Sequence, residues 1–230
     1  MSITLYALAG RDAARHFSPH VWKVEMALAH KGLPYTVKAV GFVEIPDIEG
    51  GFSKTVPVIR DGDTLVNDSF DIALHLERAY PDRPTLFGGP GGEAMARFVE
   101  RWSFLTLHAW IGRAALMDIF HCLKDDDRAY FRTSREARFG KALEETPKGR
   151  EETVADFRKA LEPLRQTLSH QQFLGGEGPL FADYIVFGAL QWMRVVCPMN
   201  PLESGDPVAN WFERCLDLHG GVGRAVAAAA

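Results

Sequence analysis

The sequence predicts an α/β domain with the element order βαβ-ββα, followed by an all-α helical bundle. Three observations support this: residues 1–80 alternate short β-rich runs with helical patterns, residues 81–92 are rich in proline and glycine, and residues 93–230 carry helical periodicity only. A chain of 230 residues is long enough to form two packed units. We therefore expect a linker at residues 81–92 between the two domains.

The first domain opens with a strand over Ile3 to Leu8 and continues with a helix that begins at Ser18-Pro19. Serine is a favoured N-cap, and proline suits the first helical position because the N–H it lacks has no partner there. Gly32 ends this helix. Its apolar residues share one face, and we expect its polar residues to point into solvent: Lys23, Glu25, His30 and Lys31.

The second half of this domain carries the remaining strands and a second helix. A strand is expected over residues 35–40, and a hairpin with an Asp-Gly-Asp turn is expected over residues 56–66. Asn67 or Asp68 can cap the helix that follows, and Pro81 ends it.

The second domain is predicted to be helical throughout. The run from Phe181 to Val196 is apolar almost all round, which is typical of a buried central helix. Residues 206–218 form a further amphipathic pattern, and we expect the alanine-rich end of the chain to fray.

Composition disfavours several classes of partner and site. The formal net charge of -4 is too small to indicate a polyanion such as nucleic acid. The three cysteines are widely spaced and form no CxxC pair, so we expect neither a disulfide framework nor a metal site. The chain has no secretory signal at its start and no uncharged apolar run long enough to cross a membrane, so we expect a cytoplasmic protein without a membrane partner.

Three dipeptides of the first domain have both a structural and a functional interpretation. Ser18-Pro19 can be a helix cap and nothing more. Val56-Pro57 can be a proline at a strand edge, or a cis bond that turns the Val56 N–H and C=O outward to meet an extended peptide. Asp68-Ser69 can belong to a capping box with Asp71, or can bind an anion at the helix N-terminus and an ammonium at Asp68.

Taken in this order, the three dipeptides resemble those of the glutathione transferases, whose first domain is thioredoxin-like. The stretches SPHVW, TVPVI and YPDRPTLF are most similar to the bacterial lignin β-aryl etherases and related fungal transferases, and ADYIVFGALQW and WFERCLDLHGG extend the resemblance into the helical domain. The resemblance implies glutathione as co-substrate, with Val56 and Pro57 facing its cysteinyl part and Asp68 and Ser69 facing its γ-glutamyl part. Lys54 is the candidate for its glycyl carboxylate.

A transferase of this kind has to stabilise the glutathione thiolate. The thiol pKa is about 8.5, and lowering it by two units requires about 2.7 kcal/mol. A hydroxyl that donates to a charged partner supplies about 1.5–3 kcal/mol, and a helix N-terminus adds about 0.3–1 kcal/mol. Ser18 offers both, so it is the predicted catalytic residue. The alternative is Tyr6 of the first strand, which is more typical of an aromatic residue packed against the sheet.

The site for the electrophilic acceptor is expected between the domains, lined by the first helices of the bundle. The candidates are aromatic or histidine side chains, each of which also suits the core: Trp102, Phe104, His108, Trp110, Tyr130 and Phe131. His16 and His20 flank Ser18 and can serve as an acid or an orienting group, or can simply be solvated at a surface turn.

The predicted function is therefore a glutathione S-transferase whose thiolate attacks a hydrophobic, aromatic electrophile. The branch resemblance alone implies β-aryl ether cleavage, and the family resemblance implies a homodimer. Two alternatives stay open, namely a non-catalytic protein of the same fold that binds hydrophobic ligands, and a glutathione-dependent isomerase or dehalogenase. One departure concerns Leu180: many family members have serine or threonine three residues before Asp183, so the capping box is incomplete here.

Overall fold

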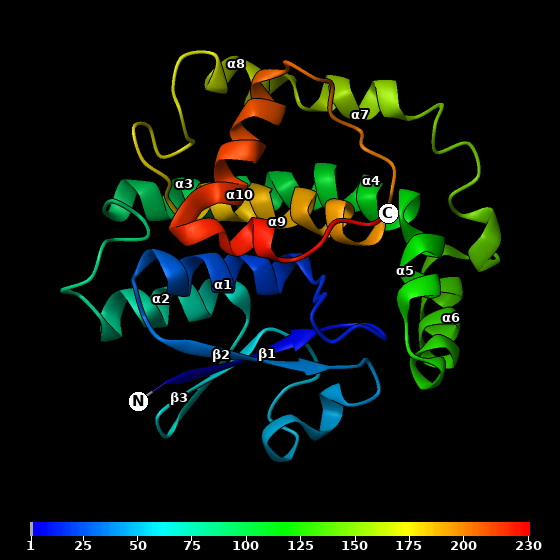
Figure 1. Ribbon diagram of the computed structural model, residues 1–230, viewed down its shortest axis with the longest axis horizontal. Coiled ribbons are helices and arrows are strands. Elements are labelled where there is room, and N and C mark those ends of the chain that lie inside the picture. Colours follow the sequence, from blue (N-terminus) through cyan, green and yellow to red (C-terminus); the bar gives the residue numbers. More distant parts are fainter. Residues whose placement is uncertain (1) are drawn as a thin grey trace.

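A computed structural model describes residues 2–230 (Figure 1). Its N-terminal domain holds a four-stranded sheet of order β2-β1-β3-β4, in which β1 and β2 are parallel and the other pairs are antiparallel. The strands are β1 (Ile3–Leu8), β2 (Tyr35–Val40), β3 (Val58–Asp61) and β4 (Thr64–Asn67). The helices are α1 (Pro19–His30), the 3-10 helix η1 (Ile45–Gly50) and α2 (Ser69–Ala79). This is the predicted thioredoxin-like arrangement, with α1 and α2 on one side of the sheet.

The C-terminal domain is a helical bundle, as predicted. Beyond β4, the described chain contains no strand, only an isolated bridge between Phe173 and Gly176. The helices are α3 (Pro90–Ser103), the π-helical turn η2 (Phe104–His108), α4 (Ala109–Ala114), α5 (Leu116–Cys122), α6 (Asp125–Phe139), the 3-10 helix η3 (Leu143–Glu145), α7 (Val154–Ala160), α8 (Glu162–Leu168), α9 (Phe181–Val196) and α10 (Pro207–Ala225). Helix α9 lies in the middle, and α5 and α6 extend beside the N-terminal domain (Figure 1).

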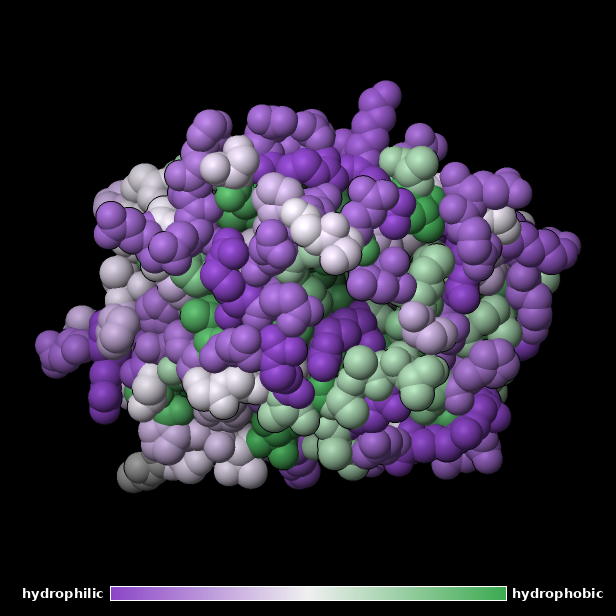
Figure 2. Space-filling view, turned by 45° about the horizontal axis from the view of Figure 1, so that its top comes forward, coloured by the Kyte–Doolittle hydropathy of each residue, from purple (hydrophilic) through white to green (hydrophobic). Residues whose placement is uncertain are grey.

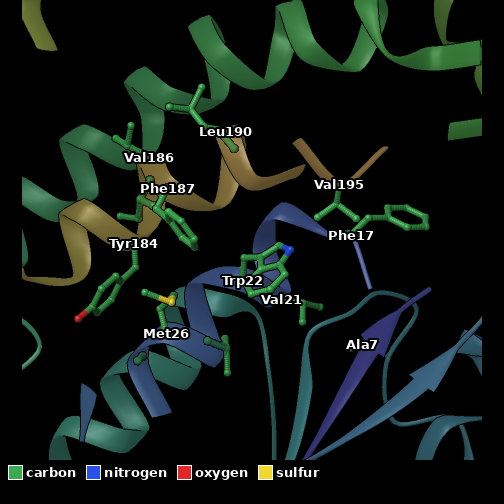
Figure 3. Packing of buried hydrophobic residues seen from close by; sticks show 14 of the residues in the cluster. Ala7, Phe17, Val21, Trp22, Met26, Tyr184, Val186, Phe187, Leu190 and Val195 are labelled. Atoms are coloured by element: carbon green, nitrogen blue, oxygen red, sulfur yellow. The ribbon is translucent and has the colours of Figure 1, made fainter. Parts of the chain in front are cut away.

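Helix α1 forms the centre of the molecule because it packs between the sheet and α9. Trp22 is fully buried and meets the Phe187 ring edge-on, with ring centroids 6.1 Å apart. Met26 and Val21 of the same helix are equally buried (Figure 3). Gly188 permits this close approach, since a Cβ at that position would lie 2.3 Å from the Pro19 carbonyl oxygen. The start of α1, where Ser18 stands, is thus held directly against α9.

The expectation that the polar residues of α1 point into solvent is wrong for Lys23, Glu25 and Lys31, which are all buried. Lys23 is covered by the helical domain, where its partner Glu100 lies, whereas Glu25 and Lys31 have their partners within the N-terminal domain. Lys23 Nζ lies 3.1 Å from Glu100 Oε1, and Lys31 Nζ lies 2.9 Å from Glu77 Oε2. Buried charges require such partners because desolvating an unpaired ion is strongly unfavourable.

Several features differ from the sequence expectations, among them the hairpin, whose strands span Val58–Asp61 and Thr64–Asn67 instead of residues 56–66. Helix α3 begins at Pro90, inside the segment expected to be linker, because proline fits the first helical turn. Helix α10 continues past Leu218 after a break with non-helical dihedral angles at residues 218–221. The alanine-rich end is tied down at two points, since Ala229 N–H donates to the Arg194 carbonyl and Arg194 donates to the Val226 carbonyl.

Polar residues predominate on the face of the molecule seen in Figure 2, and hydrophobic residues gather there in smaller groups. Of the helices formed by residues 2–230, none combines the length and the apolar character needed to span a membrane.

A chain of two histidines and a tyrosine joins α1 to the helical domain. Tyr184 Oη lies 2.6 Å from His30 Nδ1 and 2.8 Å from His219 Nε2. Burial lowers the pKa of both histidines, and repulsion by His30 contributes to a pKa of about 4 for His219. Both rings are therefore neutral in the folded protein at neutral pH.

This arrangement predicts a loss of stability in mild acid. Between about pH 6.5 and pH 4 the unfolded chain binds a proton at His219 that the folded chain does not bind, so the free energy of unfolding falls as the pH falls. In His219→Gln, we expect the free energy of unfolding to change less steeply with pH than in the unaltered protein, by at most about 1.4 kcal/mol per pH unit. Urea unfolding at pH 7.5, 6.0 and 5.0 measures the free energy of unfolding and hence its slope against pH. The exposed His170→Gln should keep the slope of the unaltered chain; equal slopes in all three proteins would contradict the prediction.

Candidate functional site

A cavity of about 750 Å³ lies between the two domains. The N-terminal domain contributes the start of α1 and the loops before β3, and the helical domain contributes η2, α4, α5, α6 and one residue of α9. The lining residues are Leu8, Phe17, Ser18, Pro19, His20, Phe42, Val43, Ile45, Pro46, Lys54, Thr55, Val56, Phe104, His108, Ala109, Gly112, Arg113, Leu116, Ile119, Tyr130, Phe131, Arg135, Arg138, Phe139 and Trp192. A concave, mostly apolar space with a few polar groups is the usual form of a small-molecule site.

Ser18 lies at the N-terminus of α1 and lines this cavity. It is the N-cap, with an extended backbone, and its Oγ accepts from the Val21 N–H at 3.5 Å. The capping interaction uses an oxygen lone pair and leaves the hydroxyl proton free to donate. Ser18 is therefore a helix cap and also a hydrogen-bond donor facing the cavity at the positive end of a helix.

The segment before Ser18 is fixed by His16, which is buried instead of solvated. His16 Nε2 lies 2.5 Å from Glu25 Oε2, and its ring stacks on Trp22 with centroids 4.6 Å apart. Tyr35 Oη donates to the other oxygen of Glu25 at 3.3 Å. These contacts tie the turn to α1 itself, so they hold the Ser18 backbone in position.

The Val56-Pro57 bond is cis, as the resemblance implies. Val56 lines the cavity, and within the described chain its backbone N–H and C=O form no hydrogen bond with other backbone groups. An extended peptide in the cavity could pair with this donor and acceptor. Pro57 itself is buried and does not line the cavity.

Asp68 and Ser69 begin α2. Asp68 Oδ1 accepts from the Phe70 N–H at 2.8 Å and from the Asp71 N–H at 3.3 Å, so the capping interpretation is correct for its side chain. Its φ of 66° is unusual for a residue other than glycine, and such outliers concentrate at functional sites. The Ser69 N–H, at the first helical position, is left out of the cap. Neither residue lines the large cavity described above.

Tyr6 does not reach the cavity. Its hydroxyl donates to Glu49, which also pairs with Arg60, and the Lys38 ammonium lies 5.1 Å from its ring centroid. Burial, followed by the hydrogen bond to Glu49, raises the pKa of Tyr6. Tyr6 is therefore a structural residue of the sheet, and of the two candidates only Ser18 lines the cavity.

The structure places some of the predicted acceptor residues at the cavity and others away from it. Phe104, His108, Tyr130 and Phe131 line the cavity, whereas Trp102 and Trp110 do not. Trp110 stacks on Phe157, with centroids 4.2 Å apart, and donates to Thr153 Oγ1. Residues two positions apart point to different sides of a helix, so the face that carries residues 104 and 108 directs both tryptophans elsewhere.

His20 lines the cavity and stacks on His108, with ring centroids 5.3 Å apart. His108 Nδ1 donates to the Ser103 carbonyl oxygen at 3.1 Å, which leaves Nε2 as the acceptor of a neutral ring. Burial and then the positive charge of Lys23 lower the pKa of His108 to about 4. Burial, Lys23 and His108 also lower the pKa of His20. Both rings are neutral at pH 7.

Sequence reasoning missed three arginines of the cavity wall, Arg113, Arg135 and Arg138. The spacing of three between Arg135 and Arg138 indicates one face of a helix, but nothing local indicates that this face meets a cavity. The wall is held by Asp127 of α6, whose Oδ1 accepts from the Val43 N–H at 2.8 Å. Gly41 is required beneath it, since a Cβ there would lie 2.5 Å from Asp127 Oδ2.

Solved structures define the class of this architecture. GSTFuA2, a glutathione transferase from Phanerochaete chrysosporium, superposes with a TM-score of 0.76 at 27% identity, covering 98% of this chain and 95% of that one. CsGST63524 of Ceriporiopsis subvermispora, a glutathione S-transferase solved in complex with glutathione, superposes with a TM-score of 0.81 at 22% identity, covering 95% and 96%. The thioredoxin-like domain joined to a helical bundle is thus the glutathione transferase fold.

Sequence relatives lead to the same assignment. The model of the glutathione S-transferase C-terminal domain matches residues 94–218, and that of the N-terminal domain matches residues 17–79. The glutathione S-transferase-like protein ustS of Aspergillus flavus is 30% identical over 209 residues, covering 78% of this chain and 75% of that protein. The chain belongs to the glutathione S-transferase family, whose co-substrate is glutathione.

Proposed function

We propose that this protein is a glutathione S-transferase in which Ser18 stabilises the glutathione thiolate for attack on a hydrophobic, aromatic electrophile. The observation that carries the proposal is the Ser18 hydroxyl, whose proton is free, at the N-terminus of α1 and on the wall of the interdomain cavity. A donor and a helix N-terminus act on the same anion there, and together they supply the free energy that a two-unit fall in thiol pKa requires.

The rest of glutathione is proposed to extend across the N-terminal domain. Its cysteinyl backbone pairs with the Val56 N–H and C=O beside Pro57. Its γ-glutamyl end reaches the start of α2, where the Ser69 N–H can bind the carboxylate and Asp68 the ammonium. Lys54, an exposed ammonium on the cavity wall, is the proposed partner of the glycyl carboxylate.

The acceptor is proposed to lie against Phe104, His108, Tyr130 and Phe131. In the transfer step the sulfur forms a bond to the electrophilic carbon, and the bond from that carbon to the leaving group breaks with its electron pair on the leaving group. The thiol proton has already passed to solvent. An aryl ether next to a carbonyl would release a phenolate in this way, and an aryl halide would release halide.

Ultraviolet difference spectroscopy of the unaltered protein tests the proposal. Titration with glutathione at pH 6.5 should produce a thiolate absorbance that free glutathione lacks at this pH, because its thiol pKa is about 8.5. A screen of aryl ethers, halides and epoxides then identifies the acceptor. Glutathione binding without a thiolate band and without turnover would favour the non-catalytic ligand-binding alternative.

A homodimer is proposed as the assembly. Large apolar side chains of α3 and η2 are exposed, with Met95 at 58%, Phe98 at 64% and Leu105 at 74%. Apolar rows of this kind usually mark interaction surfaces. Light scattering should therefore report twice the chain mass of 25.6 kDa; a monomer at micromolar concentration would contradict the proposal.

A further inference from the structure

The polar lining of the cavity has one sign of charge. Lys54, Arg113, Arg135 and Arg138 all line it, and none of the lining residues found within residues 2–230 is an aspartate or a glutamate. The chain as a whole is acidic, with a formal net charge of -4. The local excess of positive charge is therefore a property of the cavity. A low-dielectric cleft lined by one sign of charge concentrates ligands of the opposite sign.

Arg135 is the most enclosed of these cations. Its guanidinium carbon lies 4.8 Å from the Phe131 ring centroid and 5.6 Å from that of Phe42. One of its nitrogens donates to Ser134 Oγ at 2.8 Å, and within the described chain it has no carboxylate partner. Burial, and then the charge of Arg138, lower the pKa of Arg135. A guanidinium has five N–H donors, so most of them remain free.

The two arginines of α6 that do not line the cavity have carboxylate partners. Arg132 pairs with Glu136 and Glu144, and Arg128 pairs with Asp125. Carboxylates of α6 and η3 therefore pair with arginines that do not line the cavity, whereas Arg135 and Arg138 on the cavity side have no carboxylate partner among residues 2–230. A desolvated cation without a partner is unfavourable unless a ligand neutralises it.

Two aromatic rings, Phe42 and Phe131, flank the same cation. Phe42 contacts both Phe131 and Tyr130, with ring centroids 5.6 Å and 5.8 Å apart. An arginine guanidinium binds carboxylates and similar oxyanions with paired hydrogen bonds. Aromatic rings next to such a guanidinium therefore suit a ligand with a flat ring that carries an anionic group.

We propose that the acceptor of this transferase is an aromatic anion, a planar ring with a carboxylate, sulfonate or phenolate group that Arg135 and Arg138 bind. The inference rests on the proposed function, because it assigns a substrate class to the same cavity. The glycyl carboxylate of glutathione is the competing occupant of Arg135, and the experiments separate the two.

Binding is measured first, with saturating glutathione present. The probes are 8-anilinonaphthalene-1-sulfonate and N-phenyl-1-naphthylamine, which differ only by the sulfonate, and fluorescence gives each Kd. The sulfonate should bind about tenfold or more tightly than the neutral probe, as expected of hydrogen bonds to a charged group. Arg135→Gln should remove that preference and Arg138→Gln should reduce it. Arg83→Gln, at an exposed arginine outside the cavity, should leave it unchanged.

Turnover is measured next, with 4-chloro-3,5-dinitrobenzoate and its methyl ester. The glutathione sulfur bonds to the ring carbon, the carbon–chlorine bond breaks to give chloride, and the thiol proton goes to solvent. Each kcat/KM is divided by the uncatalysed rate constant to correct for ring reactivity. The corrected kcat/KM should be higher for the acid than for the ester. Arg135→Gln should lower the corrected kcat/KM of the acid about tenfold, and it should leave that of the ester and the KM for glutathione unchanged.

Equal affinity for the two probes in the unaltered protein would overturn the inference. So would an Arg135→Gln variant that raises the KM for glutathione equally with both acceptors, because Arg135 would then serve the glycyl carboxylate. A sulfonate preference that depends on Arg135, without conjugation of any acceptor, would support the anion site and contradict the proposed transferase activity. Arg138→Gln, at an exposed position, carries the test if Arg135→Gln does not fold.

Discussion

Ser18→Ala is expected to raise the thiol pKa of bound glutathione by about one to two units and to lower kcat/KM at pH 6.5 by about 10- to 100-fold. The hydroxyl is the donor that the structure brings to the cavity at the start of α1, and a hydrogen bond to a charged group contributes about 1.5–3 kcal/mol. Because activity follows the thiolate fraction, the rising limb of the pH–rate profile should move to higher pH. The variant should approach the unaltered protein near pH 9.

The same substitution also removes a helix cap, and Ser18→Gly separates the two effects. Glycine is an acceptable N-cap that lowers helix stability by only a few tenths of a kcal/mol, yet it has no hydroxyl. If the hydroxyl acts on the thiolate, alanine and glycine at this position should lose activity equally. Recovery of activity in Ser18→Gly, or an unchanged thiolate band in Ser18→Ala, would remove Ser18 from the proposed role.

Asp183→Ala is expected to lower the free energy of unfolding by about 4 kcal/mol. Asp183 is fully buried at the start of α9, where its carboxylate accepts from the N–H groups of Leu174, Gly175 and Leu180 and from Trp211 Nε1, at 2.7–3.0 Å. Alanine leaves these four donors without a partner, and each unsatisfied buried donor is unfavourable by about 1–3 kcal/mol, with partial relaxation. Urea unfolding followed by circular dichroism measures the loss.

Asp156→Ala is the matched control for this substitution. Asp156 also lies in the first turn of a helix, α7, but it is exposed and makes no side-chain hydrogen bond in the described chain. Its replacement should change the free energy of unfolding by less than about 0.5 kcal/mol. Asp183→Asn keeps part of the hydrogen-bond acceptor capacity, so its loss of unfolding free energy should lie between those of Asp156→Ala and Asp183→Ala. Similar stabilities for Asp156→Ala and Asp183→Ala would show that the buried carboxylate contributes little.

Asp183 also explains why the incomplete capping box at Leu180 is tolerated. Leucine cannot accept the hydrogen bond that serine or threonine would accept, so only the half of the box made by Asp183 is present, from the Leu180 N–H. The remaining capacity of the carboxylate goes to the loop at residues 174–175 and to α10. The missing serine or threonine at position 180 is thus compensated by hydrogen bonds from Asp183 to residues that lie outside the capping box.

The sequence predicted those parts of the site that depend on neighbouring residues. The Ser18-Pro19 cap, the strands of the sheet, the Asp68 cap and the central helix α9 all follow from propensity and periodicity within a few turns. The cis bond at Val56-Pro57 required the family resemblance, because most bonds before proline are trans. Among the aromatic residues, helical spacing could have separated Phe104 and His108 from Trp102 and Trp110, since both pairs cannot face one cavity.

Tertiary structure alone decided which polar groups are buried and which face the cavity. Lys23 looks like a solvated residue of an amphipathic helix, yet its partner Glu100 is 77 residues away in the chain. Arg135 and Arg132 lie on one helix, but packing against Phe42 encloses the first while Glu144 pairs with the second. Local sequence determines the secondary elements and their caps because those interactions span a few residues. Burial and charge pairing depend on segments that are distant in the chain and meet only in the folded protein.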